Sequence, residues 1–513
     1  MQALLGLGEK VFVNKLILNT FNPELRWRSG ANHQTNNVNV HFIAIGGSVM
    51  HQLAIALRRK GYTVTGSDDE IFEPARANLE SEGLLPASFG WYPEKINPAL
   101  DAVILGMHAR ADNPELQRAR ELGLPIYSFP EYIYQESRDK IRVVIGGSHG
   151  KTTTTSMVMS ALKAAGKDFD WLVGARLDGF AQSVNITGAP IIVCEGDEYP
   201  ASALEKRPKF HFLFPHIAVL TGIAWDHINV FPTFEFYLEQ FRIFLDKIEP
   251  GGVLIYNQTD PVLARLVEEH ATAAGVRGAT GGGTDGTDGG TDGTGRTPLR
   301  TIGYGIPIHR IQNGITVVTL EGQSGELKVF GEHNLLNLHA AWLVAKELGV
   351  DAAGFLRGMA PFTGAAKRLE LLASGPDLNV YRDFAHAPSK VKATIQAVRM
   401  QFPERRLIAV LELHTYSSLN EQFLSEYGGT LEGADAAAVF YSLHALELKR
   451  LPPLPEEKVQ AGFAKTGLVV IHKKEELASW LMEQSYKNAN LLLMSSGNYD
   501  GLDIAAFINR ITQ

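Results

Sequence analysis

The stretch Val143-Val144-Ile145-Gly146-Gly147-Ser148-His149-Gly150-Lys151-Thr152-Thr153-Thr154 decides the fold of the central part of this chain. It begins as an apolar strand, turns through closely spaced glycines and continues as a helical pattern over about 153–165. Glycines let the backbone N–H groups of such a turn point at phosphate oxygens, and the start of the helix adds a favourable dipole. We therefore expect Lys151 to reach the β- and γ-phosphates of a nucleoside triphosphate and Thr152 to ligate Mg²⁺.

The spacing of the glycines marks a shortened variant of the common phosphate-binding loop. That loop has a glycine five residues before the Gly of Gly-Lys-Thr, where this chain has Ile145, and its first glycine follows at Gly146. The strand–turn–helix context disfavours the alternative, a structural glycine-rich turn with a solvated lysine. The expected nucleotide contacts of the loop are Gly147, Ser148, His149, Gly150, Lys151, Thr152 and Thr153.

The length and composition indicate a globular protein of several domains. A chain of 513 residues is too long for one hydrophobic core and suggests about three domains. The net charge of −8 and the pI near 6.1 argue against a nucleic acid as the default partner. The single cysteine, Cys194, lies in an apolar run and suits a buried position in a reducing compartment. Because no apolar run is long enough to span a bilayer and no signal peptide precedes the first domain, we expect a cytoplasmic protein.

Strands and helices alternate along most of the chain, which predicts α/β domains with parallel sheets. Residues 1–38 form a leader to which we assign no role. Three α/β units follow in series, at 39–138, 139–361 and 362–513, and the phosphate loop opens the middle one. A Gly/Thr/Asp-rich segment at about 274–297 cannot bury apolar area and is expected to be a flexible surface insertion.

The first unit contains a second glycine loop, which is a weaker signal. Its glycines follow an apolar strand, and Asp68 ends the next strand, as in a dinucleotide-binding fingerprint that lacks its third glycine. Such a loop can also hold the diphosphate of another nucleotide, or the glycines can be purely structural. The candidate contacts are Gly46, Gly47, Ser48, Met50, Ser67 and Asp68.

Acidic residues follow the buried strand at 191–195 in the middle unit. Glu195, at the carboxyl end of that strand and beside the phosphate loop, is well placed to hold Mg²⁺. Asp226 and His227 follow the next strand in the same way, although a single histidine can equally be structural.

Further polar groups follow near the border of the second and third units. His333, Asn334 and Asn337 lie at a helix start and suit the edges of an adenine ring. Arg368 is a bidentate phosphate donor, and the first strand of the third unit ends in a carboxylate, an imidazole and a lysine. Taken singly, each of these groups could be solvated surface. The residues of that strand end are Asp383, His386 and Lys390.

The order of these motifs resembles the Mur ligase family over about 40–500. The motifs are Gly-Ser-His-Gly-Lys-Thr-Thr, Glu-x-Asp-Glu, Asp-His, Gly-x-His-Asn-x-x-Asn, Phe-x-Gly…Arg-x-Glu and Asp-Phe-Ala-His. The resemblance implies a Rossmann-like N-terminal domain for a UDP-sugar, a P-loop ATPase central domain and a Rossmann-like C-terminal domain for an amino acid or peptide. It also implies an ATP-dependent, ADP- and phosphate-forming amide ligase of peptidoglycan synthesis, with no nucleic-acid partner and no membrane insertion.

The resemblance assigns a role to each motif. Lys151, Glu195 and His227 become catalytic, and Thr152, Glu195 and His227 become ligands of Mg²⁺. The ATP contacts then include His333, Asn334 and Asn337 on the adenine side and Arg368 and Asp383 from the C-terminal side. The glycine loop of the first unit would bind the UDP portion of the sugar nucleotide.

Within the family, the first-unit motifs are similar to those of ligases that take UDP-N-acetylmuramate. The Glu-x-Asp-Glu-Tyr form favours the tripeptide L-Ala-γ-D-Glu-meso-diaminopimelate as the acceptor, as in peptidoglycan recycling, with L-alanine as the alternative. An arginine usual in the tripeptide branch is absent from the loop 412–418, and Arg242 stands where other branches carry a carbamylated lysine. The expected acceptor contacts are His386, Lys390, His414, Thr415 and Ser417.

Two readings outside this branch remain open. The chain could be an ATP-binding switch that has lost ligation, because its C-terminal loop departs from the family pattern. A nicotinamide-dependent oxidoreductase would use the first glycine loop but leaves the ATP motifs unexplained.

Overall fold

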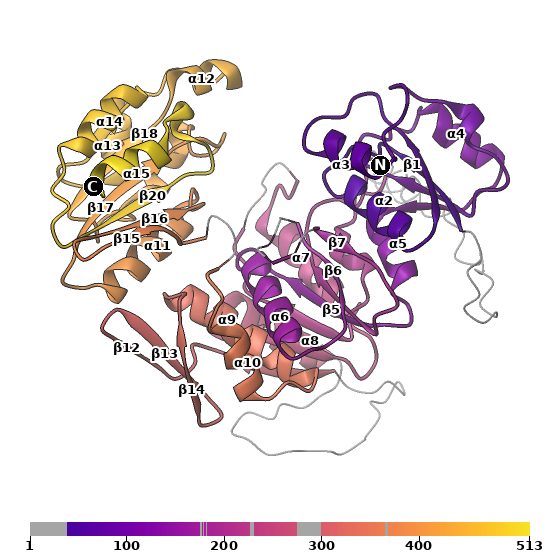
Figure 1. Cartoon of the computed structure of the whole chain (residues 1–513), viewed down its shortest axis with the longest axis horizontal. Helices are drawn as coiled ribbons and strands as arrows, with labels where there is room; N and C mark the ends of the chain where they lie inside the picture. Colours follow the sequence, from indigo (N-terminus) through magenta and orange to yellow (C-terminus); the bar gives the residue numbers. More distant parts are fainter. Residues whose placement is uncertain are drawn as a thin grey trace, which may run out of the picture. The chain divides into compact units, whose positions relative to one another are not determined.

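The computed structural model describes residues 38–174, 177, 179–180, 182–225, 230–273, 299–364 and 368–512. Its elements are drawn in Figure 1. The chain divides into two compact units, of which the first holds Met1–Tyr132 and Ser202–Glu205 and the second holds Ile133–Ala201 and Lys206–Gln513. Almost all of the leader and the whole Gly/Thr/Asp-rich insertion lie outside the described residues.

The first unit is built on a four-stranded parallel sheet in the order β2-β1-β3-β4. Strand β1 is buried along most of its length because its neighbours lie on both sides and helices cover its faces. Leu204, from the short segment that belongs to this unit, packs against the core around Ile43 and Leu116. The elements are β1 (Asn39–Ile43), α2 (Met50–Arg59), β2 (Thr63–Ser67), α3 (Ala75–Ser81), η1 (Pro93–Lys95), β3 (Ala102–Leu105), α4 (Pro114–Glu121), β4 (Ile126–Ser128) and α5 (Phe129–Glu136).

The second unit begins with a seven-stranded sheet in the order β11-β10-β9-β5-β8-β6-β7. All neighbouring strands are parallel except β6 and β7. Strand β5, which leads into the phosphate loop, is therefore central and flanked by β8 and β9, so the carboxyl ends of all three strands lie at one edge. The strands are β5 (Ile141–Gly146), β6 (Asp170–Leu172), β7 (Val184–Asn185), β8 (Ile191–Glu195), β9 (Ile217–Leu220), β10 (Val253–Asn257) and β11 (Arg300–Tyr304).

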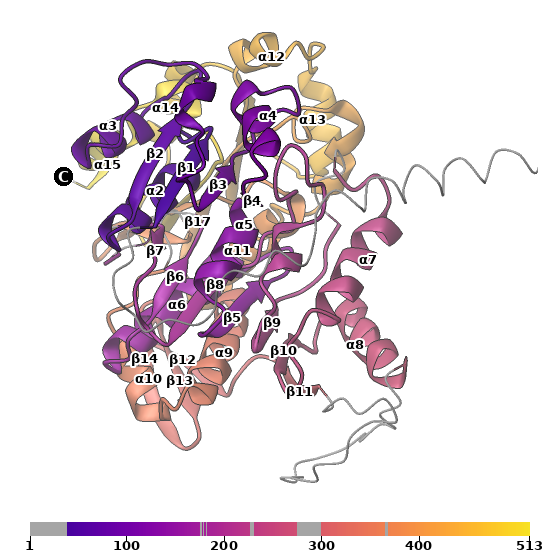
Figure 2. The same ribbon diagram turned by 90° about the vertical axis from the view of Figure 1, so that its right-hand side faces the viewer.

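Helices cover this sheet, and α6, α9 and α10 contact one another over a large apolar core. Val143, Met157 and Leu338 are among the fully buried members of that core. Figure 2 shows α7 and α8 beside the β9–β11 part of the sheet. The helices are α6 (Lys151–Ala164), η2 (Lys209–Phe212), α7 (Phe234–Leu245), α8 (Pro261–Ala273), α9 (Glu332–Glu347) and α10 (Ala352–Met359).

A small antiparallel sheet precedes α9 and contacts the C-terminal part of the chain. Its strands are β12 (His309–Gln312), β13 (Ile315–Leu320) and β14 (Gln323–Leu327). The Thr316 hydroxyl donates to Gln401 Oε1 at 3.0 Å, and Gln401 Nε2 donates to the Gly314 carbonyl at 2.7 Å. Phe330 stacks edge-on against Tyr381 and Phe402, so apolar contacts support the same junction.

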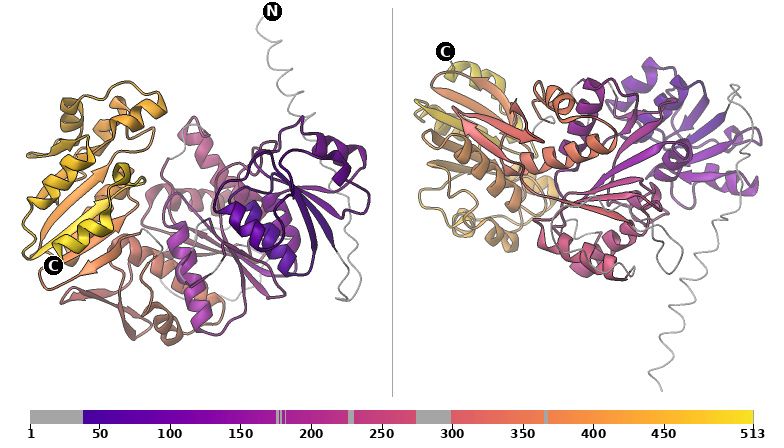
Figure 3. Two further views of the ribbon diagram at one scale, coloured as in Figure 1. Left: turned by 45° about the horizontal axis from the view of Figure 1, so that its top comes forward. Right: turned by 90° about the horizontal axis from the view of Figure 1, so that it is seen from below.

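The C-terminal part forms a six-stranded sheet in the order β15-β16-β20-β17-β18-β19, parallel except for β15. Separate apolar cores lie on its two faces, so the sheet is covered by helices on both sides, as Figure 3 shows. Its strands are β15 (Glu370–Ser374), β16 (Leu378–Asp383), β17 (Arg406–Glu412), β18 (Ala436–Phe440), β19 (Val469–Ile471) and β20 (Ala489–Met494). Its helices are α11 (Pro388–Gln401), η3 (Glu421–Tyr427), α12 (Leu443–Lys449), α13 (Glu456–Phe463), α14 (Lys474–Met482), η4 (Tyr499–Gly501) and α15 (Ile504–Ile511).

The predicted α/β class with parallel sheets is confirmed. The second and third predicted α/β units each have their own sheet, although both fall within one compact unit of the chain. Cys194 is 1% exposed on β8, and burial raises the pKa of its thiol to about 12, as expected for an inert buried cysteine. Among the described helices, none is long and apolar enough to cross a membrane.

Candidate active site

The phosphate loop joins β5 to α6 and depends on two glycines with positive φ. Gly147 has φ +118° and Gly150, the N-cap of α6, has φ +82°, a conformation that residues with a Cβ rarely adopt. A Cβ on Gly150 would lie 2.3 Å from Asn337 Oδ1 on α9. Glycine is therefore required at residue 150 both by the backbone conformation and by the close approach of α9.

Lys151 is the first residue of α6 and is held by two acceptors. Its Nζ donates to the Gly147 carbonyl at 2.6 Å and to Glu198 Oε2 at 2.8 Å, and Glu198 is only 2% exposed. Burial opposes the charged form of Lys151, but the carboxylate of Glu198, aided by Glu195, raises its pKa above the ordinary value. The lysine thus stays cationic at the point where a triphosphate would meet the loop.

Thr152 and Glu195, two of the predicted Mg²⁺ ligands, are hydrogen-bonded to each other. The Thr152 hydroxyl donates to Glu195 Oε1 at 2.7 Å, and the Gly174 N–H donates to Glu195 Oε2 at 2.9 Å. A hydroxyl and a carboxylate oxygen at this separation are hard ligands that fit a shared Mg²⁺. The predicted third ligand, His227, lies with Asp226 outside the described residues, and within the described ranges no cluster of three His, Cys, Asp or Glu residues could hold a metal.

Residues that follow β9 brace the phosphate loop. The Thr221 hydroxyl donates to the Gly146 carbonyl at 3.2 Å and also to the His149 carbonyl. The Ser148 hydroxyl is hydrogen-bonded to the Tyr237 hydroxyl at 2.8 Å and accepts from the Ala224 N–H at 2.8 Å. The backbone N–H of Ser148 donates to the Gly222 carbonyl at 2.9 Å, so both the side chain and the backbone N–H of Ser148 fix the loop.

The first turns of α9 supply the predicted adenine-side residues. Asn337 Oδ1 accepts from the Thr154 hydroxyl at 3.2 Å, and Asn334 Nδ2 donates to the Phe330 carbonyl at 2.9 Å. Burial, with a further contribution from Arg368, lowers the pKa of His333 to about 4. His333 is therefore neutral at pH 7, which suits contact with an uncharged base.

The end of β16 supplies Asp383, whose carboxylate organises the local backbone. Asp383 Oδ2 accepts from the Leu369 N–H and Oδ1 accepts from the Ala385 N–H, both at 2.6 Å. Burial raises the pKa of Asp383 despite these bonds and the nearby Arg368. The guanidinium of Arg368 lies 5.0 Å from the centroid of the Phe384 ring, a cation–π contact that fixes its direction.

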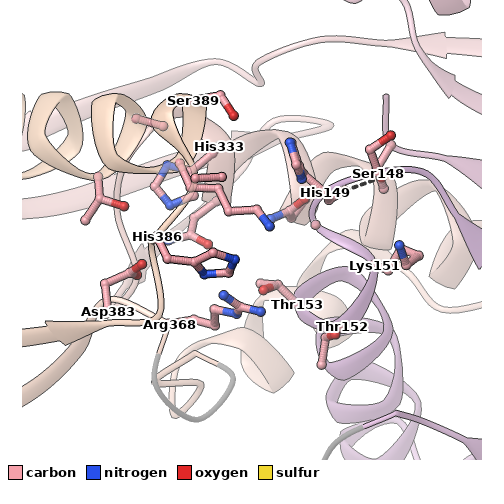
Figure 4. Close-up of a pocket in the computed structure, with 18 of the residues that line it drawn as sticks. Ser148, His149, Lys151, Thr152, Thr153, His333, Arg368, Asp383, His386 and Ser389 are labelled. Atoms are coloured by element: carbon pink, nitrogen blue, oxygen red, sulfur yellow. Dashed lines mark hydrogen bonds between the residues drawn. The ribbon is translucent and has the colours of Figure 1, made fainter. Parts of the chain in front are cut away.

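Most of these groups line one cavity of about 740 Å³ within the second unit, and Figure 4 labels ten of the lining residues. The phosphate loop and Glu195 form one wall, and α9, Arg368, Asp383 and the start of α11 form the other. The predicted residues that the cavity brings together are Ser148, His149, Gly150, Lys151, Thr152, Thr153, Glu195, His333, Asn334, Asn337, Arg368, Asp383, His386, Lys390, Thr415 and Ser417.

Of the predicted site residues in this unit that the structure describes, two do not line the cavity. Gly147 contributes its carbonyl to Lys151, as described above. His414 lies with its Nδ1 3.6 Å from Oε1 of the buried Glu412, one residue before Thr415. Arg242, on α7, is paired with Glu235 and Glu239 and is also outside the cavity lining.

Several cavity residues were not predicted as site residues from the sequence. Thr221 could have been identified because it is the last residue of a strand predicted over 217–221, beside the phosphate loop. Phe423 and Tyr427 lie on the short helix η3, whose sequence has no regular apolar period. Only the tertiary fold brings these two residues to the site. The missed lining residues are Tyr199, Thr221, Leu336, Ala387, Ser389, Ala393, Thr394, Phe423 and Tyr427.

In the glycine loop of the first unit, a backbone N–H is bonded to a buried carboxylate and not to a group of the phosphate loop. The Gly46 N–H donates to Asp68 Oδ2 at 2.7 Å, and Asp68 is 1% exposed. Burial raises the pKa of Asp68 to about 6. Ser67 is buried and its hydroxyl accepts from Lys95 Nζ at 3.0 Å, while Met50 starts α2 and is buried as well.

Three domain descriptions match successive parts of the chain. Residues 39–140 match the Mur ligase family catalytic domain, residues 145–345 the Mur ligase middle domain and residues 367–497 the Mur ligase glutamate ligase domain. The first and third matches each correspond to one of the four sheets, and the middle match spans the seven-stranded sheet and the small antiparallel sheet. Together the middle and third matches cover the phosphate loop and the whole cavity lining.

Curated relatives with about one third identity match most of the chain. The UDP-N-acetylmuramate–L-alanine ligase of Arthrobacter sp. (strain FB24) is 33% identical over 401 residues, which are 78% of this chain and 80% of that protein. The enzyme of the same name from Saccharopolyspora erythraea is 33% identical over 452 residues, 84% of this chain and 87% of that protein.

Solved structures share the fold at lower identity. The UDP-N-acetylmuramate–alanine ligase of Thermotoga maritima has a TM-score of 0.61 at 21% identity and covers 92% of this chain and 99% of its own. The murein peptide ligase of Psychrobacter arcticus has a TM-score of 0.55 at 21% identity and covers 92% of this chain and 98% of its own. The predicted three-domain architecture is thus confirmed.

Proposed function

We propose that this chain, which belongs to the Mur ligase family of ATP-dependent amide ligases, joins the lactyl carboxylate of UDP-N-acetylmuramate to the amine of L-alanine. The observation that carries the choice of acceptor is the name shared by curated relatives such as those of Arthrobacter and Saccharopolyspora. The sequence alone favoured the tripeptide acceptor, and these comparisons support L-alanine better.

The ATP-side roles follow from the cavity. Lys151 and the backbone N–H groups of its loop would hold the β- and γ-phosphates, because the lysine is cationic and the loop is preformed. Thr152 and Glu195 would hold Mg²⁺, which when bound neutralises the charge that gathers between phosphate and carboxylate. Arg368, directed by its stacking on Phe384, would meet the same phosphates from the opposite wall.

The carboxylate is a poor electrophile, and phosphorylation by ATP would convert it into an acyl phosphate that an amine can attack. Attack forms a tetrahedral intermediate, which collapses to the amide as phosphate leaves. The chain contributes positioning and charge neutralisation, and the walls of the cavity limit access of water to the reactive ester. His386, Lys390, Thr415 and Ser417, on the wall opposite the phosphate loop, would face the acceptor.

The first glycine loop would hold the UDP portion through Gly46, Gly47, Ser48, Met50, Ser67 and Asp68. In the free protein the Gly46 N–H already donates to Asp68. A diphosphate could accept a hydrogen bond from that N–H only if Asp68 moves or is protonated. We therefore propose that Asp68 controls whether the Gly46 N–H is available to the diphosphate.

The tripeptide L-Ala-γ-D-Glu-meso-diaminopimelate is the second candidate acceptor. The observation that favours it is the Glu195–Tyr199 motif, whose final tyrosine lines the cavity together with Glu195. Thr415 and Ser417, from the loop that lacks the arginine of the tripeptide branch, line the cavity too and would have to replace it.

Phosphate release from ATP in the presence of Mg²⁺ and UDP-N-acetylmuramate tests the proposal, with L-alanine and the tripeptide compared as acceptors. Stimulation by L-alanine alone supports the main proposal, and stimulation by the tripeptide alone replaces it with the recycling reaction. ATP binding without stimulation by either acceptor would contradict ligation and identify an ATP-binding switch.

A further inference from the structure

We propose that His386 is the general base that removes a proton from the acceptor's ammonium group before the amine attacks. The proposal rests on the function proposed above, because it assigns a role within that reaction. Free amino acids carry a protonated amine at neutral pH, and an ammonium group has no lone pair with which to form an amide bond. A proton acceptor in the cavity is therefore part of what the reaction requires.

The hydrogen bond of His386 fixes which ring nitrogen can act. His386 Nδ1 lies 2.8 Å from the Phe384 carbonyl oxygen. A carbonyl oxygen only accepts, so Nδ1 must carry the hydrogen, and in the neutral ring the lone pair is on Nε2. The tautomer needed for a base at Nε2 is thus set by the backbone two residues earlier.

Two further contacts hold His386 in place. The Tyr427 hydroxyl donates to the His386 carbonyl, and both residues line the cavity. The imidazole packs edge-on against the Phe384 ring, with centroids 5.2 Å apart and an angle of 85° between the planes. Arg368 also contacts this ring, so Phe384 supports the phosphate-binding cation and the base together.

The position of His386 suits this role better than that of the other histidines on the walls. In Figure 4 its side chain points from the start of α11 into the cavity that Thr152 and Thr153 also line. His333 has a pKa of about 4 and is too weak a base to take a proton from an ammonium group at neutral pH. His149 belongs to the phosphate loop, where its carbonyl is held by Thr221.

The proton balance of the step is complete. The acceptor's ammonium gives one proton to Nε2 of His386, which becomes an imidazolium, and the freed lone pair forms the C–N bond at the acyl carbon. The C–O bond to phosphate then breaks with its electron pair moving to the phosphate, and the second N–H proton leaves with that phosphate. The imidazolium returns its proton to water after the amide has left.

Hydroxylamine separates this role from ATP binding and from carboxylate activation. It is largely neutral at pH 7, so it can attack an acyl phosphate, giving a hydroxamate, without a base. We expect His386→Gln to lose about 10²- to 10⁴-fold in amide formation while hydroxamate formation from UDP-N-acetylmuramate and ATP stays within about threefold of the wild type. His444→Gln, the same substitution at an exposed position of the C-terminal part, should change neither rate.

The pH profile provides an independent readout. In the variant, amide formation should rise about tenfold per pH unit toward the pKa of the amine, because only the free amine reacts, whereas the wild type should depend on pH less steeply because His386 removes the proton within the site. A variant that loses amide and hydroxamate formation equally, or neither, would overturn the role of His386. If the wild type itself makes no hydroxamate, the proposed function fails and this role fails with it. A thermal shift with ATP shows that the variant is folded, and His386→Asn replaces it if it is not.

Discussion

The two glycine loops of this chain look alike in sequence but differ in backbone conformation and in the charge that faces them. Both follow an apolar parallel strand and precede a helix, at 45–48 and 146–150. In the second loop Gly147 and Gly150 have positive φ, whereas neither Gly46 nor Gly47 does. The second loop ends in a cationic lysine, and the first directs an N–H at a carboxylate. Glycine content alone therefore does not define an anion site, since the charge of the neighbouring side chain decides whether an N–H is available.

The largest expected effect comes from removing the cation of the second loop. Lys151→Ala should lower phosphate release by at least about a hundred-fold, because a preorganised charge at the transferred phosphate is lost. It should also lower the Tm, because the buried Glu198 loses its partner.

The double variant Lys151→Met with Glu198→Gln separates these two effects in the same assays. It should recover most of the Tm but not the activity. Ligation at the wild-type rate in either variant would contradict the assignment of the loop.

A glycine-to-alanine substitution in each loop tests the difference in backbone conformation between the two loops. Gly150→Ala should destabilise the protein by more than about 1 kcal/mol, because alanine is strained at positive φ and its Cβ would meet Asn337. At Gly47 a Cβ would meet the flexible Met50 side chain at 3.2 Å, so Gly47→Ala should change the free energy of unfolding by less than about 0.5 kcal/mol. Chemical denaturation of the two variants measures both values, and equal effects would show that the loops do not differ in this way.

The smallest expected effect is a pH dependence confined to the first loop. The folded-state pKa of Asp68 is raised to about 6, so between about pH 4 and 6 the folded state binds more protons than the unfolded state. Asp68 therefore makes the protein less stable as pH rises through this window, by up to about 3 kcal/mol. Asp68→Asn keeps a carbonyl acceptor for the Gly46 N–H and removes the titration.

The Tm difference between Asp68→Asn and the wild type measures this contribution. The Tm of the variant should rise relative to that of the wild type between pH 4 and 7, and the difference should stay constant above pH 7. A difference that does not change with pH would show that Asp68 is ionised throughout.

Local patterns in the sequence were sufficient to predict the phosphate loop and strands such as β3 and β8, but not others such as β10 and the small antiparallel sheet. Apolar runs such as 191–195 and 102–105 were predicted with the bounds that the structure has, because a strand buried on both faces is apolar throughout. The helix after the loop begins at Lys151, two residues earlier than its periodicity indicated, because Gly150 caps it through backbone conformation.

Contacts between distant residues could not be predicted in the same way. The bond from Gly46 to Asp68 depends on the register that pairs Ile43 with Ser67 across β1 and β2. The bond from Lys151 to Glu198 spans 47 residues, and the Tyr427 contact with His386 spans 41. None of these pairs has a local sequence signal, because each depends on how separate elements pack.

Helix α11 is held at its C-terminal end by the hydrogen bonds of Gln401. The helix is 14 residues long, which corresponds to about 21 Å. Its C-terminal end contacts the small antiparallel sheet, and its N-terminal end lies at the cavity. At its C-terminal end the buried Gln401 is tied to Thr316 and Gly314 of the small antiparallel sheet, and just before its first residue His386 enters the cavity. A rotation of about 10° around the Gln401 end would displace the His386 end by about 4 Å. A change of tilt at Gln401 would therefore move His386 relative to the cavity, although Gln401 is not among the cavity-lining residues.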